Sequence, residues 1–207
     1  YAERKGAIIH PSEWQSDNQQ LAPHKKGQLK ALERGKLIHK LLERLPLFPE
    51  YVQENTAIRY IKKQMPKLSE EEVIMLFGEV NSILHHKECS DLFSKDSLAE
   101  AAIIGKIGEL EISGQIDRLI VTDTHIKIAD FKTGRPSDNP PQTYLRQMAL
   151  YMGLLKQLYP DRSFHSFLIW TQTAEIMPLL NEQLNAYLDT IKGCLLYTSD
   201  AADELRS

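Results

Sequence analysis

In the first half of the chain, apolar residues recur at the spacing of a helix. Between residues 26 and 45, leucine and isoleucine return every three or four positions, which predicts one amphipathic helix. Pro46 and Pro49 follow, and proline cannot continue a helix. Residues 1–25 are polar with few periodic apolar positions, so we expect a linker or an extended arm before this helix.

Two more helices are expected in the same half. One covers residues 52–64. The other begins after Ser69, because Ser69 followed by Glu72 is the pattern of a capping box, and it runs to about His86. The N-terminal half is therefore predicted to be helical.

From residue 98 onward the pattern changes to that of strands. Residues 98–104 are predicted to form a strand, and residues 109–121 alternate clearly between apolar and polar positions. Residues 125–131 alternate again. The polar turn at residues 122–124 lies between these two segments and predicts a β-hairpin.

The rest of the chain returns to helices with one strand between them. We expect a helix over residues 142–158, an aromatic strand over 164–171 and a last helix over 182–191. The order of helices, hairpin, helix, strand and helix predicts an α/β sandwich, in which a small mixed sheet is flanked by helices.

The predicted hairpin brings charged residues together. With the turn centred between Asp123 and Thr124, Asp117 faces Asp130, with their Cβ atoms about 4.5–5.5 Å apart. Two like charges at this separation need a counter-charge, and carboxylate oxygens are the ligands that Mg²⁺ prefers. Alternation places Lys132 on the same side as Asp130. Two carboxylates and an ammonium group on one patch are suited to activating water against a phosphodiester.

Each feature also has an ordinary structural explanation. Aspartate and lysine near a hairpin are common on solvated surfaces, and Asp123 is explained as a turn residue. Gly35 and His39 lie one helical turn apart on the first helix, and Gln147 and Tyr151 do so on the helix after the hairpin. A single histidine or tyrosine on an apolar helix belongs more often to the core than to a site. Only the combination points to function.

In combination, these residues resemble the RecB-type branch of the PD-(D/E)XK nuclease superfamily over about residues 30–175. The wording around His39 and Asp117 is most similar to the C-terminal nuclease domain of the AddA family of helicase–nucleases. The acid that the family carries before the hairpin falls at Glu100. The matching motifs occur in the family's order and read Gly35-Lys-Leu-Ile-His39, Gly114-Gln-Ile-Asp117-Arg118, Ile128-Ala-Asp130-Phe-Lys132-Thr-Gly134 and Gln147-Met-Ala-Leu-Tyr151.

The resemblance implies the PD-(D/E)XK nuclease fold and a magnesium site. A bound divalent ion polarises the scissile phosphate and lowers the pKa of a bound water. The ligands implied for Mg²⁺ are His39, Asp117, Asp130 and the backbone carbonyl of Phe131.

The resemblance also implies roles for residues that do not bind the ion. Lys132 would orient or deprotonate the attacking water and offset the charge of the transition state. Asp117 and Asp130 complete the catalytic set. Gln147 and Tyr151 would position the DNA strand.

The family resemblance further implies a larger assembly. The domain would be the DNA exonuclease of a protein that acts in double-strand break repair by recombination, with an AddB-like partner subunit and ATP used by a helicase motor. No Gly-x-x-x-x-Gly-Lys-Ser/Thr loop occurs in the chain, so that motor would lie in sequence outside it.

Two other interpretations stay open. A stand-alone exonuclease of the type used in CRISPR adaptation would carry cysteines for an iron–sulfur cluster, and Cys89 alone cannot hold one. A nuclease-like fold without catalysis would instead serve as a DNA-binding or subunit-docking module.

Composition sets limits on these functions. The 207 residues are 42% hydrophobic, which suits one domain with a single core. No apolar run approaches the roughly 18 residues that span a membrane, and no secretion signal is present, so we expect a cytoplasmic protein. The formal net charge of −3 is not that of a strongly basic nucleic-acid-binding domain, so DNA would be bound by local charge.

The two ends of the chain are interpreted separately. Residues 194–204 resemble the translation of a transposase adapter used to prepare sequencing libraries, so we expect residues 194–207 to be a non-native tail. The nuclease domain is then residues 26–193, and Cys89 is its only cysteine. The chain starts at Tyr1 rather than at methionine, and we interpret it as a fragment of something larger.

Overall fold

The computed structural model describes residues 8–11 and 26–191. Most of the predicted arm at residues 1–25 and all of the predicted tail at 194–207 lie outside the described residues. The helices are α1 (Lys26–Arg44), α2 (Glu50–Gln64), α3 (Glu70–Leu84) and α4 (Gln142–Leu158), with the short 3-10 helices η1 (Leu45–Leu47) and η2 (Lys87–Phe93), and residues 181–191 are helical as well. The strands are β1 (Ile8–Ile9), β2 (Ser97–Ile107), β3 (Leu110–Val121), β4 (His125–Lys132), β5 (Ser163–Trp170) and β6 (Glu175–Leu179).

The strands form one mixed sheet. Its order is β1-β3-β4-β5-β6, and β2 pairs with β3 as well. β3 is antiparallel to both β2 and β4, and β5 is antiparallel to β6. β4 and β5 are parallel because α4 carries the chain back between them. The predicted fold class, a mixed sheet flanked by helices, is confirmed.

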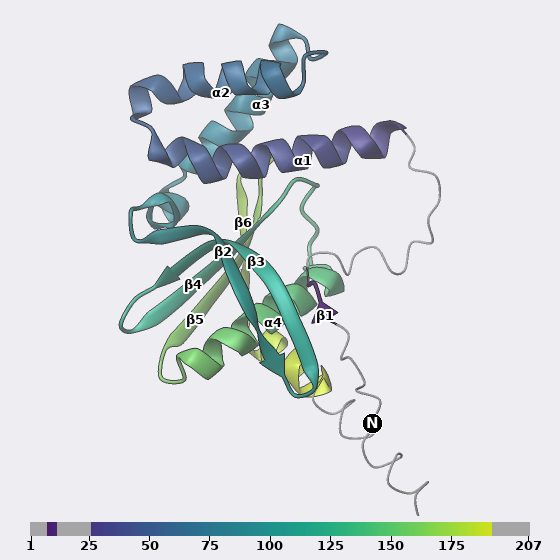
Figure 1. Ribbon diagram of the computed structural model, residues 1–207, viewed down its shortest axis with the longest axis vertical. Helices are drawn as coiled ribbons and strands as arrows, with labels where there is room; N and C mark the ends of the chain where they lie inside the picture. The colour runs from purple at the N-terminus through teal and green to yellow at the C-terminus, as the bar shows by residue number, and fades with distance from the viewer. Residues whose placement is uncertain (1–7, 12–25, 192–207) are drawn as a thin grey trace, which may run out of the picture.

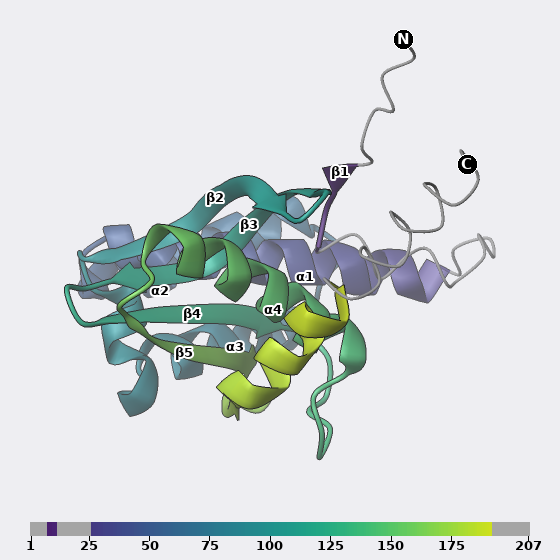
Figure 2. The same ribbon diagram turned by 90° about the horizontal axis from the view of Figure 1, so that it is seen from below.

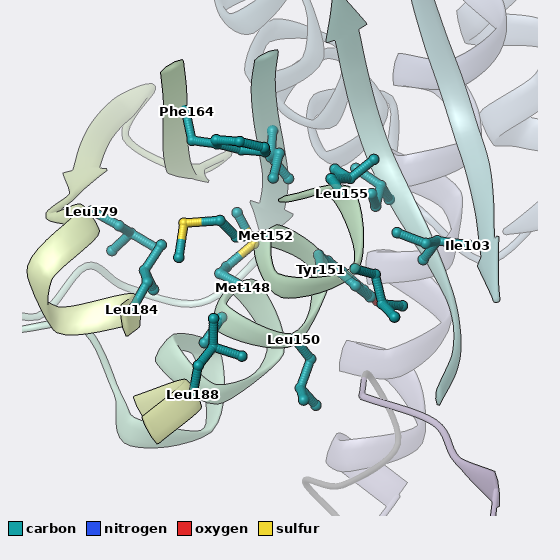
Figure 3. Packing of buried hydrophobic residues seen from close by; sticks show 14 of the residues in the cluster. Ile103, Met148, Leu150, Tyr151, Met152, Leu155, Phe164, Leu179, Leu184 and Leu188 are labelled. Carbon is teal, nitrogen blue, oxygen red and sulfur yellow. The ribbon is translucent and has the colours of Figure 1, made fainter. Parts of the chain in front are cut away.

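Helices cover both faces of the sheet (Figures 1 and 2). On the face that we call the α1 face, α1, α2 and α3 pack over strand residues that include Ile120, Phe131 and Ile169. On the α4 face, α4 and the helix at 181–191 pack over Ile116 and Ile128, among others. Figure 3 shows side chains of this second core gathered around α4, with Met148, Tyr151 and Met152 labelled along the helix. The protein therefore has two hydrophobic cores separated by the sheet.

Local sequence signals explain several element boundaries. Ser69 caps α3, because its side chain accepts a hydrogen bond from the backbone of Glu72 while the Glu72 side chain accepts one from the backbone of Ser69. The capping box predicted there is confirmed. Strand β6 was not predicted, since it contains Pro178, and proline occurs in strands mainly at sheet edges such as this one.

The N-terminal segment contributes one short strand to the sheet. Ile8 and Ile9 pair in parallel with Glu111 and Ile112 of β3. Two residues are too few to show an alternating pattern, so no strand could be predicted within the expected arm.

Candidate functional site

The strand β3 is irregular at Asp117. The β2–β3 ladder continues from Ser97 opposite Ile120 to Ile107 opposite Leu110, but the pair of Glu100 and Asp117 is absent from it. The backbone of Glu100 has a φ of 51°, a left-handed conformation that costs a residue with a Cβ roughly 1–2 kcal/mol. Such strain is found most often at functional sites.

The irregularity changes which residues face each helical layer. Before it, Ile116 packs in the core of the α4 face, and after it Leu119 does so, although regular alternation would place these two residues on opposite faces. Arg118 instead reaches α1, as does Asp117. Two consecutive side chains of β3 therefore point toward the same helix.

The hairpin register agrees with the sequence analysis up to this point. Arg118 pairs with Ala129 and Val121 pairs with Ile126, as a turn centred between residues 123 and 124 requires. The ladder stops there, so Asp117 and Asp130 are not a paired position. The Asp117 side chain contacts α1 whereas that of Asp130 contacts α4, so the two acids are not the directly opposed pair that the sequence predicts, although their charges interact.

Helix α1 brings His39 to Asp117. The helix passes close to the end of β4 at Gly35, where a Cβ atom would lie 3.3 Å from the Thr133 hydroxyl. One turn later, His39 Nδ1 lies 3.3 Å from Asp117 Oδ1. The other carboxylate oxygen of Asp117 accepts a hydrogen bond of 2.6 Å from the backbone N–H of Phe131. Gly35 thus lets α1 lie close to the end of β4, and this brings His39 to Asp117.

Arg118 fixes the end of α1 over the sheet. Its guanidinium group donates hydrogen bonds to the backbone carbonyls of Leu42 and Glu43. These carbonyls belong to the last turn of α1, where carbonyl groups have no partner within the helix. The cation also lies 4.9 Å from the ring centroid of Phe93. A positive charge at the C-terminal end of a helix is stabilising, so this contact stabilises the turn of α1 that follows His39.

Three side chains form a candidate metal centre on the α1 face. Ligand atoms of His39, Glu100 and Asp117 all lie within 4.8 Å of one another. Carboxylate oxygens are ligands that Mg²⁺ and Mn²⁺ prefer, and an imidazole nitrogen is a ligand for softer divalent ions. The residues present therefore fit a divalent ion. The family resemblance places an acid before the hairpin at Glu100. That this acid lies next to His39 depends on the irregular backbone of β2.

The charges in this centre affect one another strongly. Burial alone would lower the pKa of His39, but its hydrogen bond with Asp117 and the nearby carboxylates outweigh burial and raise the pKa to about 9. Burial and the charge of Asp117 raise the pKa of Glu100. Without a metal ion, the protonated imidazole is the cation that makes the closeness of the two acids tolerable.

A second polar cluster lies on the α4 face. Lys132 Nζ is 2.6 Å from Asp130 Oδ2 and donates a hydrogen bond of 3.1 Å to Gln147 Oε1. The same glutamine donates a hydrogen bond of 2.8 Å to Asp130 Oδ1. Burial, with a contribution from Asp117, raises the pKa of Asp130 even though Lys132 acts in the opposite direction. Oδ1 of Asp130 therefore has a hydrogen-bond partner, whereas Oδ2 has an ion-pair partner and accepts no hydrogen bond.

Tyr151 packs beneath this cluster. Its hydroxyl lies 3.3 Å from Gln147 Nε2, and its ring occupies the space that a side chain at position 114 would need. A Cβ atom on Gly114 would lie 2.7 Å from the ring. Burial raises the pKa of Tyr151 to about 12, so its hydroxyl stays protonated at neutral pH.

The predicted site residues are thus brought together in two groups. His39 and Asp117 meet on the α1 face, and Asp130 and Lys132 meet on the α4 face with Gln147. Gln147 and Tyr151 were predicted to contact DNA; both are buried, and in the structure they hold other site residues. Their contact with substrate stays a prediction. Phe131 contributes its N–H group, and the predicted ligation through its carbonyl also stays a prediction.

Sequence comparison decides the family. The family model of the PD-(D/E)XK nuclease superfamily matches residues 13–191. This chain belongs to that superfamily. Members of the PD-(D/E)XK superfamily are typically metal-dependent nucleases, and among the described residues the cluster of His39, Glu100 and Asp117 could hold a metal ion.

Other comparisons add less. No curated protein matches the chain. Among solved structures, that of SSO0001 resembles the chain with 13% identity and a TM-score of 0.35, over 84% of this chain and 88% of that one. A likeness this weak carries no argument about fold or function. Across the described part of the chain, no helix has the length and apolar character needed to cross a membrane.

Proposed function

We propose that this domain is a magnesium-dependent deoxyribonuclease. The observation that carries the proposal is the meeting of His39, Glu100 and Asp117 within 4.8 Å, together with a lysine ion-paired with Asp130, whose charge interacts with His39 and Asp117. A nuclease needs both a cation that binds the phosphate and a positioned group that orients the attacking water. The two clusters supply residues for these two tasks.

The cluster on the α1 face would hold the ion. His39, Glu100 and Asp117 provide one nitrogen and two carboxylate groups, and hard oxygen ligands favour Mg²⁺. Asp130 would join them while keeping its hydrogen bond from Gln147, since its charge already interacts with His39 and Asp117. The bound ion would polarise the scissile phosphate and make a bound water more acidic.

The cluster on the α4 face would act on the reacting atoms. The Lys132 ammonium group would orient the attacking water and offset the negative charge that develops on the phosphate. Gln147 would keep this ammonium group and the Asp130 carboxylate in a fixed relation, because it bonds to both. Tyr151 would support the glutamine from below.

The finer proposal concerns the biological setting. The similarity of the motifs around His39 and Asp117 to the AddA family supports an exonuclease that acts in double-strand break repair by recombination. In that setting an AddB-like subunit would be the partner, and a helicase motor in another part of the protein would use ATP and deliver the strand. DNA would be the substrate of this domain with or without the partner subunit and the motor.

A cleavage assay with the purified chain tests the proposal. Linear single- and double-stranded DNA labelled at one end, and circular DNA of each kind, are incubated with Mg²⁺ or with EDTA. We expect linear DNA to be degraded only with Mg²⁺, and circular DNA to persist. Lys132→Ala should abolish cleavage and leave the circular dichroism spectrum unchanged.

The matched control is Lys95→Ala, which removes an exposed lysine from the turn between η2 and β2. This variant should cleave like the parent chain. Full cleavage by Lys132→Ala would end the catalytic assignment. Binding of DNA without any cleavage by the parent chain would favour the module without catalysis.

A further inference from the structure

The ammonium group of Lys132 has neighbours on more than its polar side. Asp130 and Gln147 bind it through oxygen atoms. In addition, the Nζ atom lies 4.0 Å from the centroid of the Tyr144 ring. A cation over the face of an aromatic ring is attracted by the ring's quadrupole. Lys132 is thus held between a carboxylate, an amide and a ring.

Tyr144 is itself well placed to act as a fixed surface. It lies in the first turn of α4, three residues before Gln147, so both side chains project from one face of the helix. Its ring packs against Trp170 with the centroids 6.0 Å apart. Trp170 is 2% exposed. The tyrosine ring is therefore supported from behind by a buried side chain of β5.

The lysine needs such a surface more than most residues would. Its charge is at the end of a flexible four-carbon chain with three rotatable donors, and two oxygen partners leave part of its range of motion open. A ring on the remaining side limits the positions of the ammonium group without neutralising it. The charge then stays available to a phosphate.

From this geometry we propose that Tyr144 is a positioning residue for Lys132. The inference rests on the proposed nuclease function, because it assigns the ring a part in that reaction. The ring acts through the lysine and does not touch the reacting atoms. The face of the ring is the part that matters, and the hydroxyl group is not required.

The kinetic test compares two substitutions in the full chain with Mg²⁺ and linear DNA. Tyr144→Leu removes the ring and should lower kcat about 2- to 30-fold, the range that corresponds to an ordinary cation–π contact, while KM for DNA stays unchanged. Tyr144→Phe keeps the ring and should restore kcat. The control Tyr159→Leu removes a ring that contacts Arg162 beyond the other end of α4 and should not change kcat.

A spectroscopic measurement tests the contact without any catalysis. In chain labelled with ¹³C-lysine, the ring of Tyr144 should shift the Hε resonance of Lys132 upfield, and Lys132→Ala assigns that resonance by its disappearance. The shift should persist in Tyr144→Phe and vanish in Tyr144→Leu. The upfield shift can be measured whether or not the chain cleaves DNA.

The outcomes separate the two proposals. Parent chain that does not cleave DNA but shows the upfield shift contradicts the nuclease function and leaves the lysine–ring contact confirmed. Cleaving parent chain with an unshifted resonance, or Tyr144→Leu with normal kcat, overturns the positioning role. A raised KM with unchanged kcat, or a Tyr144→Phe variant as slow as Tyr144→Leu, would do the same.

Discussion

The two faces of the sheet carry polar clusters of different kinds. On the α1 face, two acids and a histidine crowd together, and the His39 side chain is 31% exposed. On the α4 face, Asp130 and Lys132 form an ion pair and are only 6% and 11% exposed. One cluster has an excess of negative charge and an opening to solvent, whereas the other is balanced and enclosed.

The difference shows how the work of a nuclease can be divided. Buried charges are tolerated when they are paired and hydrogen-bonded, which is the state of Asp130 and Lys132. The acids on the α1 face depend on a proton of His39 or on a metal ion. We infer that the α4 cluster is organised before the ion binds and that the α1 cluster is completed by it.

The largest expected effect is that of Asp117→Asn. The substitution removes a charged ligand but keeps a carbonyl oxygen that can accept the hydrogen bond from Phe131. We expect the affinity for Mg²⁺ to fall by about 100-fold or more, since loss of even an outer-shell partner costs about 10- to 100-fold. Titration calorimetry with Mg²⁺ measures the loss of affinity, and a spectroscopic titration with Mn²⁺ measures it independently.

Two controls determine whether the clusters are separable. Asp123→Asn makes the same chemical change in the exposed turn of the hairpin and should leave metal affinity unchanged. Lys132→Ala should bind the ion while failing to cleave DNA. Unchanged affinity in Asp117→Asn, or equal losses in Asp117→Asn and Lys132→Ala, would remove the distinction between the two faces.

A smaller effect is expected from Gly114→Ala on the α4 face. The new Cβ atom would lie 2.7 Å from a ring carbon of Tyr151, and the buried ring cannot move away easily. Overpacking of this kind costs about 1–3 kcal/mol. We expect the free energy of unfolding, measured with urea, to fall by the upper part of that range.

The matched control for that substitution is Gly78→Ala. Gly78 lies within α3, and a Cβ atom there would meet nothing within 4 Å. Alanine in a helix interior is favoured over glycine by about 0.5–1 kcal/mol, so this variant should gain stability. If Gly114→Ala were as stable as the parent chain, the close support of Gln147 by Tyr151 would be in doubt.

The smallest expected effect is a pH dependence from the core of the α1 face. Burial, with the charges of Asp91 and Glu88, raises the pKa of Cys89 from 9.0 to about 11. A pKa that is higher in the folded state means that stability is lost as pH rises from the unfolded to the folded value. At pH 10 the loss relative to pH 7 should be about 1.4 kcal/mol, because one pKa unit corresponds to 1.36 kcal/mol.

Urea unfolding at the two pH values, in parent chain and in Cys89→Ala, isolates this contribution. Both proteins should carry Cys194→Ser so that one thiol remains. The difference in unfolding free energy between pH 7 and pH 10 should be smaller in Cys89→Ala. Equal differences in the two proteins would show that the thiol is not held in a closed core.

The sequence predicted the elements of the site better than its shape. The hairpin could be located because alternation and a polar turn are local signals, and Lys132 follows Asp130 by simple strand geometry. The direction of the Asp117 side chain could not be predicted, because it depends on a left-handed residue at Glu100 in the neighbouring strand. No local pattern indicates that a glutamate will adopt that conformation.

The roles of the helix residues show the same limit. Helical spacing placed Gln147 and Tyr151 on one face of α4, which is correct. That their polar groups would bind Asp130 and each other, rather than face solvent, depends on how closely α4 approaches β3 at Gly114. Tyr144 carried no motif, so its contact with Lys132 could be found only from the packed structure.

The placement of His39 has a consequence for the whole molecule. Within the candidate metal centre, His39 comes from a helix and the two acids come from the sheet, so an ion bound there would join separate layers. Ligand that binds only the folded state adds stability that grows with the logarithm of its concentration. Magnesium would therefore act as a cross-link between helix and sheet, and its removal by a chelator should loosen α1 before it loosens α4.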